Sequence, residues 1–172
     1  MSNEFNSTTR EGPHSTKTDT WLTPQWIIDK IGISYLDPCG YIHPEKGIIV
    51  KTAHNYFYEN DNGLIQKWEN DCFVNPPYSD LGSWLEKMAA HGNGIVLCFA
   101  RTETKAYQKY VKSATGINFM AKRVSFLNSE GEAKNAKGQK SNGNAPSCLI
   151  AYGEENYQRI KNIDGIYCRI DK

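Results

Sequence analysis

The tetrapeptide Asn75-Pro76-Pro77-Tyr78 is the segment of the sequence whose residue types best fit a binding or catalytic role. Its two prolines have fixed φ angles and bias the residue before each of them away from the helical region, so the carbonyl groups point in defined directions. The side-chain carbonyl of Asn75 and the backbone carbonyl of Pro76 can accept both hydrogens of an exocyclic amine, and the Tyr78 ring offers a flat face for stacking a base. The same four residues can also form an ordinary turn after a strand, with the tyrosine in the core.

A second turn, Asp37-Pro38-Cys39-Gly40, places a carboxylate beside small residues that let a ligand approach the backbone. Taken alone, it also fits an ordinary turn, because Asp-Pro and Cys-Gly are common turn formers. Each of the two turns follows an apolar run that is typical of a strand. In parallel α/β sheets, ligands bind at the carboxyl ends of strands, and both turns are expected at such ends.

The elements that would position these turns are predicted from apolar periodicity and turn residues. Helices are expected from Thr23-Pro24 to Gly32, over 63–68, from Ser79 or Asp80 to Gly92, and over about 103–114. Strands are expected over 33–36, 48–50, 56–58, 72–74, 95–100, 124–127, 148–152 and 166–170. This alternation predicts an α/β fold, with a mostly parallel sheet and an antiparallel C-terminal strand pair.

Composition limits the class of protein. A length of 172 residues fits one domain, which we place at 19–172 after a Ser/Thr/Asn-rich tail over 1–18 that we expect to be disordered. The longest apolar run, 95–100, is far shorter than the roughly 18–20 residues that span a bilayer, and the N-terminus has no apolar signal core. The five cysteines are odd in number and widely spread, so neither structural zinc nor a disulfide framework is indicated.

A formal net charge of +1 gives no overall attraction to nucleic acid, so a nucleic-acid surface requires local clusters of basic residues. Six basic side chains against Glu103 alone lie between residues 101 and 123. The candidates for phosphate contacts are Arg101, Lys105, Lys109 and Arg123, together with Lys134 and Lys137 of a polar segment over 128–146. That segment is a candidate DNA-contacting loop, although its composition equally suits disorder, and a lysine-rich helix face is also common as solvated surface.

These features together resemble the phage-type DNA N6-adenine methyltransferase family. The resemblance covers roughly residues 19–153 and is carried by Thr23-Pro24, Asp37-Pro38-Cys39-Gly40, Asn62-Gly63-Leu64 with Trp68, Phe73 to Tyr78, Ala100 to Thr104, and Arg123 to Phe126. In that family, the N-P-P-Y box is catalytic, S-adenosylmethionine is the methyl donor, and the fold is a single Rossmann-like methyltransferase domain.

The resemblance implies roles for individual residues. Asn75, Pro76, Pro77 and Tyr78 would be catalytic, whereas Thr23, Pro24, Asp37, Pro38, Cys39 and Gly40 would hold the donor. The acidic residue that binds the ribose hydroxyls has two candidates, Glu59 and Asp61, and each of them also reads as a solvated loop charge. No metal is required.

The implied reaction is methylation of the N6 amine of adenine in DNA, and it has three alternatives. A related box occurs in cytosine-N4 and in glutamine methyltransferases, because all of these enzymes attack with a planar, delocalised amino group. The Asn and Tyr of the box favour adenine over cytosine, and the absence of a D-x-x-x-G-x-G turn argues against the glutamine enzymes. A non-catalytic DNA-binding module of the same fold is the third alternative. The expected location is the cytoplasm, that of the host cell if a phage encodes the protein.

Overall fold

The computed structural model describes residues 20–133 and 145–171 of the chain. The tail predicted over residues 1–18 lies outside the described residues, and so do Lys134 and Lys137 of the candidate DNA-contacting loop.

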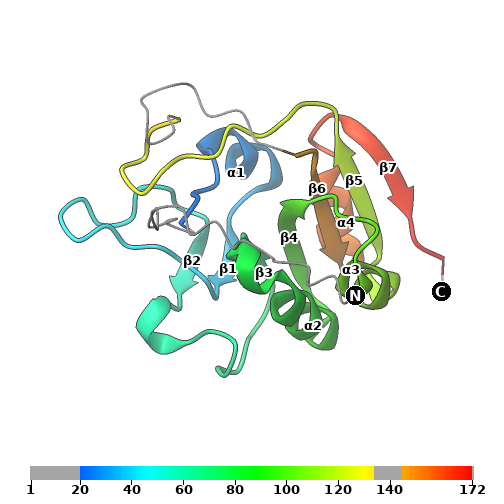
Figure 1. Ribbon diagram of the computed structural model, residues 1–172, viewed down its shortest axis with the longest axis horizontal. Coiled ribbons are helices and arrows are strands. Elements are labelled where there is room, and N and C mark those ends of the chain that lie inside the picture. The colour runs from blue at the N-terminus through cyan, green and yellow to red at the C-terminus, as the bar shows by residue number, and fades with distance from the viewer. Residues whose placement is uncertain (1–19, 134–144, 172) are drawn as a thin grey trace, which may run out of the picture.

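The described residues form one seven-stranded sheet at the centre of the molecule (Figure 1). Across the sheet, the strands are β2 (Ala53–Tyr56), β1 (Ser34–Asp37), β3 (Cys72–Val74), β4 (Gly94–Phe99), β6 (Ser147–Tyr152), β5 (Gly116–Met120) and β7 (Gly165–Arg169). The first four are parallel, whereas β6 is antiparallel to both β4 and β5, and β7 is antiparallel to β5. The predicted α/β class is confirmed, and the antiparallel part has three strands rather than the predicted pair.

Helices cover both faces of the sheet. The helices α1 (Gln25–Ile31) and α4 (Glu154–Ile160) pack on one face, and α2 (Leu81–His91) and α3 (Lys105–Tyr110) pack on the other. Three short 3-10 helices are η1 (Glu59–Asp61), η2 (Tyr78–Asp80) and η3 (Val111–Ser113). Because successive strand residues point to opposite faces, Val74 and Val96 pack toward α2, whereas Phe73 and Ile95 pack toward α1. The sheet is therefore buried on both sides, as its apolar parallel strands require.

The helix α2 confirms the prediction from apolar spacing. Trp84, Leu85 and Met88 are buried on its inner side. The helix ends at Gly92, whose φ of 76° is the left-handed conformation that glycine adopts readily, and its N–H donates to the Met88 carbonyl at 2.8 Å. The helix α2 begins directly after η2, which contains Tyr78. The packing of α2 against the sheet therefore also fixes the position of η2.

Three of the predicted elements are wrong in kind or position. Residues 48–50 form no strand, and the predicted strand over 56–58 is displaced, because β2 ends at Tyr56. Residues 63–68 form turns rather than a helix. The Trp68 indole N–H donates to the Gly63 carbonyl at 2.8 Å, and the Lys87 ammonium donates to two further carbonyls of this segment, so side chains satisfy its backbone.

The predicted strand over 124–127 is also wrong, and the strand that occupies this part of the sheet is β5. Val124 and Phe126 are apolar because they are buried over one face of the sheet, not because they belong to it. The pattern of β5 was hidden by Asn118, a fully buried polar residue whose amide donates to the carbonyls of Ile160 and Ile163. Ile160 is the last residue of α4, and Ile163 follows this helix. The helix α4 was not predicted either.

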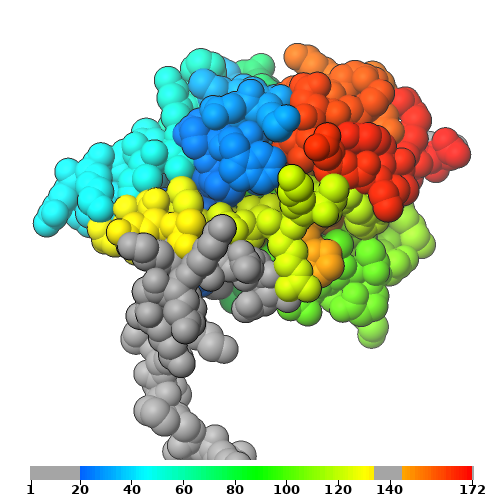
Figure 2. All heavy atoms as spheres, turned by 90° about the horizontal axis from the view of Figure 1, so that it is seen from above, coloured from blue at the N-terminus to red at the C-terminus, as the bar shows by residue number. Residues whose placement is uncertain are grey.

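The segment after β5 runs back along the molecule beside the first helix. Figure 2 shows residues 121–133, in yellow-green to yellow, against the blue region of α1 and the cyan region around residues 41–50. Leu127 forms an isolated antiparallel bridge with Leu22, and Glu130 contacts His43 at 3.1 Å and Lys46 at 2.6 Å. Three segments that are distant in the sequence therefore meet at the edge of the sheet.

Arg159 of α4 joins several elements through one guanidinium group. It donates to the Ile31 and Gly32 carbonyls at the end of α1, to Ser34 Oγ of β1, to Asp71 Oδ2 before β3 and to Asn156 Oδ1. Burial raises the pKa of Asp71, but its hydrogen bonds with Arg159 and Ser34 and the charge of Arg159 outweigh burial, and the pKa lies below its usual value. The guanidinium therefore fixes α1, β1 and β3 relative to one another.

We expect Arg159→Met to lower the free energy of unfolding by about 2–4 kcal/mol, because it leaves half-buried acceptors and the Asp71 carboxylate without their donor. Arg159→Lys keeps the charge but not the planar fork, so it should recover less than half of the loss. Urea unfolding at neutral pH measures both variants. A loss below about 0.5 kcal/mol for Arg159→Met would show that the guanidinium does not stabilise the fold.

Candidate active site

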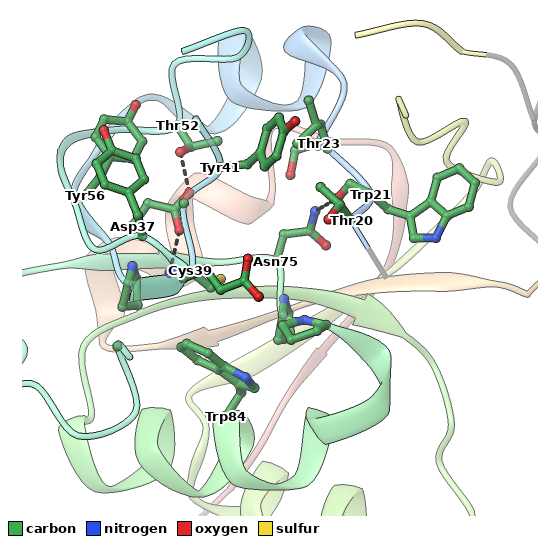
Figure 3. Close-up of a pocket in the computed structure, with 18 of the residues that line it drawn as sticks. Thr20, Trp21, Thr23, Asp37, Cys39, Tyr41, Thr52, Tyr56, Asn75 and Trp84 are labelled. Carbon is green, nitrogen blue, oxygen red and sulfur yellow. Dashed lines mark hydrogen bonds between the residues drawn. The ribbon is translucent and has the colours of Figure 1, made fainter. Parts of the chain in front are cut away.

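A cleft of about 310 Å³ opens at the carboxyl ends of β1 and β3 (Figure 3). These strands are neighbours and run parallel, so the turns that follow them lie at the same edge of the sheet. Both turns singled out in the sequence line the cleft: Asp37 to Gly40 on one side and Asn75 to Tyr78 on the other. The structure thus brings the candidate carboxylate and the diproline corner together around one space.

The other candidate donor-binding residues divide into two groups. Thr23 and Glu59 line the cleft. Pro24 does not line it, and serves instead as the residue that precedes the first turn of α1. Asp61 does not line it either, because its carboxylate accepts the Tyr58 backbone N–H at 2.7 Å and closes the turn of η1.

Further lining residues had no site role assigned from the sequence, although Asn62 and Gly63 belong to a segment that carries the family resemblance. They are Thr20, Trp21, Leu22, Tyr41, Val50, Thr52, Tyr56, Tyr58, Asn62, Gly63 and Trp84. Tyr56 and Tyr58 had a detectable signal, since they lie at the end of a strand, but the displaced strand prediction placed both of them inside it. Thr52 and Trp21 carry no such signal, because their place in the cleft depends on tertiary contacts.

Asp37 is the buried acid of the cleft, with 5% of its surface exposed. Its Oδ2 accepts the Thr52 hydroxyl at 2.5 Å, and its Oδ1 accepts the Cys39 backbone N–H at 3.1 Å. Burial raises the pKa of Asp37 to about 6, and these hydrogen bonds offset the effect of burial in part. A positively charged ligand group beside this carboxylate would relieve the unfavourable burial of its charge.

Cys39 lies beside this acid as a neutral thiol. Burial raises the pKa of Cys39 well above its usual value, and the neighbouring Asp37 charge raises it further. The thiolate, which is the reactive form of cysteine, is therefore suppressed at neutral pH. Cys39 is suited to packing against a ligand rather than to nucleophilic attack.

The turn after β1 is closely packed by two glycines. A Cβ atom on Gly40 would lie 2.6 Å from Cδ1 of the Tyr56 ring, and a Cβ atom on Gly63 would collide with the Pro38 carbonyl oxygen. The absence of side chains at these positions lets the segment 62–63 and the end of β2 pack directly on the turn. One wall of the cleft is therefore built from backbone, as close approach to a ligand requires.

Asn75 is half-buried and its side-chain amide is fixed. Its Nδ2 donates to the Trp21 carbonyl at 2.6 Å, which Figure 3 shows as a dashed line. Oδ1 is consequently the atom of this side chain that can accept a hydrogen bond from a ligand. Pro76 and Pro77, which follow it along the cleft, keep the corner stiff.

The Tyr78 ring is held by two phenylalanines. Phe99 stacks on it with ring centroids 4.2 Å apart and an angle of 4° between the planes, and Phe126 meets it edge-on at 6.4 Å and 87°. Tyr78 lines the cleft, whereas the two phenylalanines do not. The stack therefore covers one face of the tyrosine and fixes the orientation of the ring.

The candidate phosphate-contacting residues that the structure describes do not line the cleft, and they differ in how far from it they lie. Arg101 and Lys105 are exposed directly after the carboxyl end of β4, and Arg123 is exposed after β5, which runs in the same direction as β4. These three side chains are therefore at the edge of the sheet where the cleft opens. Lys109 lies one turn further along α3, where its ammonium contacts the Tyr110 ring.

Within residues 20–133 and 145–171, no three or more His, Cys, Asp or Glu side chains are grouped so that they could hold a metal ion. None of the helices in that part of the chain is long and apolar enough to cross a membrane.

Comparison with known proteins identifies one family. The family model described as DNA N-6-adenine-methyltransferase (Dam) matches residues 10–164 of the chain. Searches of the curated proteins and of the solved structures found no match.

We expect Asp37→Asn to raise the free energy of unfolding at pH 7.5 by about 1–3 kcal/mol. A carboxyl group whose pKa is raised from 3.8 to about 6 on folding binds more protons in the folded state, so the wild type loses stability as pH rises through this range. The difference between the two proteins should therefore shrink as pH falls toward 4. Urea unfolding between pH 4 and 8 measures it.

Glu59→Gln is the matched control for this measurement, because it removes an exposed carboxylate from the same cleft. It should change the stability by less than about 0.5 kcal/mol. A lower stability of Asp37→Asn than of the wild type at pH 7.5 would contradict the account of the buried acid.

Proposed function

Because the chain belongs to the DNA N-6-adenine-methyltransferase (Dam) family, we propose that it transfers a methyl group from S-adenosylmethionine to the N6 amine of adenine in DNA. The observation that carries this proposal is the position of the Asn75 to Tyr78 corner in the same cleft as the buried Asp37. The fold supports it as well: a single α/β sheet covered on both faces is compatible with the Rossmann-like methyltransferase domain that we propose for residues 19–172.

The cleft has features that suit the methyl donor. Its volume of about 310 Å³ lies at the lower end of the range of small-molecule sites. The Thr23 hydroxyl lines the cleft, is 2% exposed as a residue, and has no hydrogen-bond partner among the described residues, so a ligand atom would satisfy it. The Asp37 carboxylate complements the ammonium group of the donor. When bound, S-adenosylmethionine supplies an electrophilic methyl group on a positively charged sulfur.

We therefore assign the donor to Thr23, Asp37, Pro38, Cys39 and Gly40, with Glu59 as the acid for the ribose hydroxyls. Glu59 is preferred to Asp61 because the Asp61 carboxylate already accepts the Tyr58 backbone N–H, outside the cleft. Pro24 contributes through α1, which it precedes, rather than by contact with the donor.

The diproline corner acts on the acceptor amine. The N6 lone pair of adenine is delocalised into the ring, so the amine is a poor nucleophile. Asn75 Oδ1 and the Pro76 carbonyl would accept its two hydrogens and favour a tetrahedral nitrogen with a localised lone pair. Preorganised dipoles of this kind contribute about 3–4 kcal/mol each in other enzymes, and a stiff corner keeps that contribution available without reorganisation.

The base must leave the helical stack to reach this corner. Enzymes that modify a base inside a duplex flip the nucleotide outward into a pocket. The exposed part of the Tyr78 ring would receive the base, since Phe99 covers one face of the ring and holds it in place. For the DNA backbone, we propose Arg101, Lys105 and Arg123 beside the cleft, with Lys109 further away and Lys134 and Lys137 in the candidate loop.

The test is transfer of label from methyl-labelled S-adenosylmethionine to DNA of mixed sequence, followed by digestion to nucleosides. We expect label in N6-methyladenine with the wild type and a loss of at least about 100-fold with Asn75→Ala, because one of the two acceptors is removed. Asn55→Ala is the matched control, since Asn55 also donates its amide to a backbone carbonyl, that of Tyr35, but is an exposed residue of the edge strand β2 and does not line the cleft.

Three outcomes would contradict parts of this proposal. Label that persists undiminished in Asn75→Ala would overturn the role of the corner. Label in a cytosine nucleoside would overturn the acceptor. Absence of both transfer and stabilisation by the donor would indicate a DNA-binding module, because a bound ligand at 100 times its Kd stabilises the folded state by about 2.7 kcal/mol.

A further inference from the structure

The orientation of the Asn75 amide is decided by a backbone group, the Trp21 carbonyl. The Nδ2–O distance is 2.6 Å, and both residues line the cleft (Figure 3). A carbonyl oxygen can only accept a hydrogen bond, so the amide must turn its nitrogen toward Trp21 and its oxygen away from it. The opposite orientation would place two acceptor oxygens against each other.

The Trp21 carbonyl is in turn held by the residues that follow it. The Leu22 N–H, which belongs to the same peptide group as the Trp21 carbonyl, donates to the Leu127 carbonyl at 2.8 Å, and the Leu127 N–H donates to the Leu22 carbonyl at 2.9 Å. Next along the chain, Thr23 is buried and α1 begins after Pro24. Trp21 also packs against the buried cluster beneath this pair.

Leu127 is itself fixed. Val124 and Phe126 on the same segment are buried, with exposures of 0% and 3%. Directly after Leu127, the Asn128 side chain accepts the backbone N–H groups of Glu130 and Glu132 and closes a turn. A chain of fixed groups therefore leads from the segment 124–132 through Leu22 and Trp21 to the Asn75 amide.

We propose that the Trp21 carbonyl, held by the Leu22–Leu127 backbone pair, is a positioning group that presents Asn75 Oδ1 to the cleft before any ligand binds. This inference rests on the proposed function. An oxygen in this position selects exocyclic amines, which adenine and cytosine carry, and rejects the carbonyl groups that guanine and thymine carry at the corresponding ring positions. An amide free to rotate would offer its NH2 group to those carbonyls as well.

Leu127→Pro tests the proposal, because proline lacks the N–H that donates to Leu22. Leu127→Ala is the matched control, since it removes the side chain and keeps that N–H. The first measurement is hydrogen exchange of the Asn75 side-chain amide by NMR, without donor and without DNA. We expect at least 10-fold protection relative to urea-unfolded protein in the wild type and in Leu127→Ala, and at least a threefold reduction of that protection in Leu127→Pro.

The second measurement separates positioning from general damage. In Leu127→Pro, kcat for methyl transfer should fall at least 10-fold while the Kd of S-adenosylmethionine changes less than threefold, and in Leu127→Ala both should change less than threefold. Equal effects of the two substitutions on kcat would overturn the proposal in favour of side-chain packing. Unprotected Asn75 amide protons in the wild type would overturn it without any variant, even if Leu127→Pro does not fold.

The two proposals fail in distinguishable ways. Methyl transfer to DNA with an unprotected Asn75 amide overturns the positioning role and leaves the proposed function in place. A protected amide without any methyl transfer overturns the proposed function, and with it the part of this inference that concerns amines.

Discussion

The parallel pairing of β1 with β3 is the interaction on which the site depends. Leu36 lies opposite Cys72 in this pair, so both strands end at the same edge of the sheet. The turn that begins at Asp37 and the corner that begins at Asn75 therefore become two walls of one cleft. An antiparallel pairing would have sent the two turns to opposite edges, and the same residues could not act on one ligand.

The surroundings of the cleft keep its groups rigid rather than merely close. Stacking on Phe99 fixes the Tyr78 ring, the Trp21 carbonyl fixes the Asn75 amide, and the backbone of the first turn is packed by glycines. Burial raises the pKa of Asp37 to about 6, so we expect its ionised form to lower the stability of the folded state at neutral pH. A cationic ligand would offset the unfavourable burial of this carboxylate charge. Buried acids with a raised pKa are typical of binding sites, where stability is lower for the sake of function.

Local sequence was sufficient to predict an element where its apolar pattern and the turn beside it are adjacent in the chain. The spacing of Trp84, Leu85 and Met88 predicted α2, and the apolar run before Asn75 predicted β3 with the same bounds as the structure. It was insufficient where a strand contains a buried polar residue, or where buried apolar residues do not belong to a strand. Asn118 hides a strand because its amide bonds to distant carbonyls, and the apolar residues of 124–127 cover the sheet without joining it. The supporting residues of the site, such as Thr52, are likewise placed by contacts that no short motif records.

We propose that the turn after β1 holds the methyl donor so that it faces the diproline corner after β3. A crystal structure of the protein with S-adenosylhomocysteine tests it most directly. We expect the ligand in the cleft, with its ammonium group at Asp37 and its sulfur toward Asn75 and Pro76. A ligand bound elsewhere, or a complex in which the Asn75 side-chain oxygen and the Pro76 carbonyl face away from the sulfur, would contradict it.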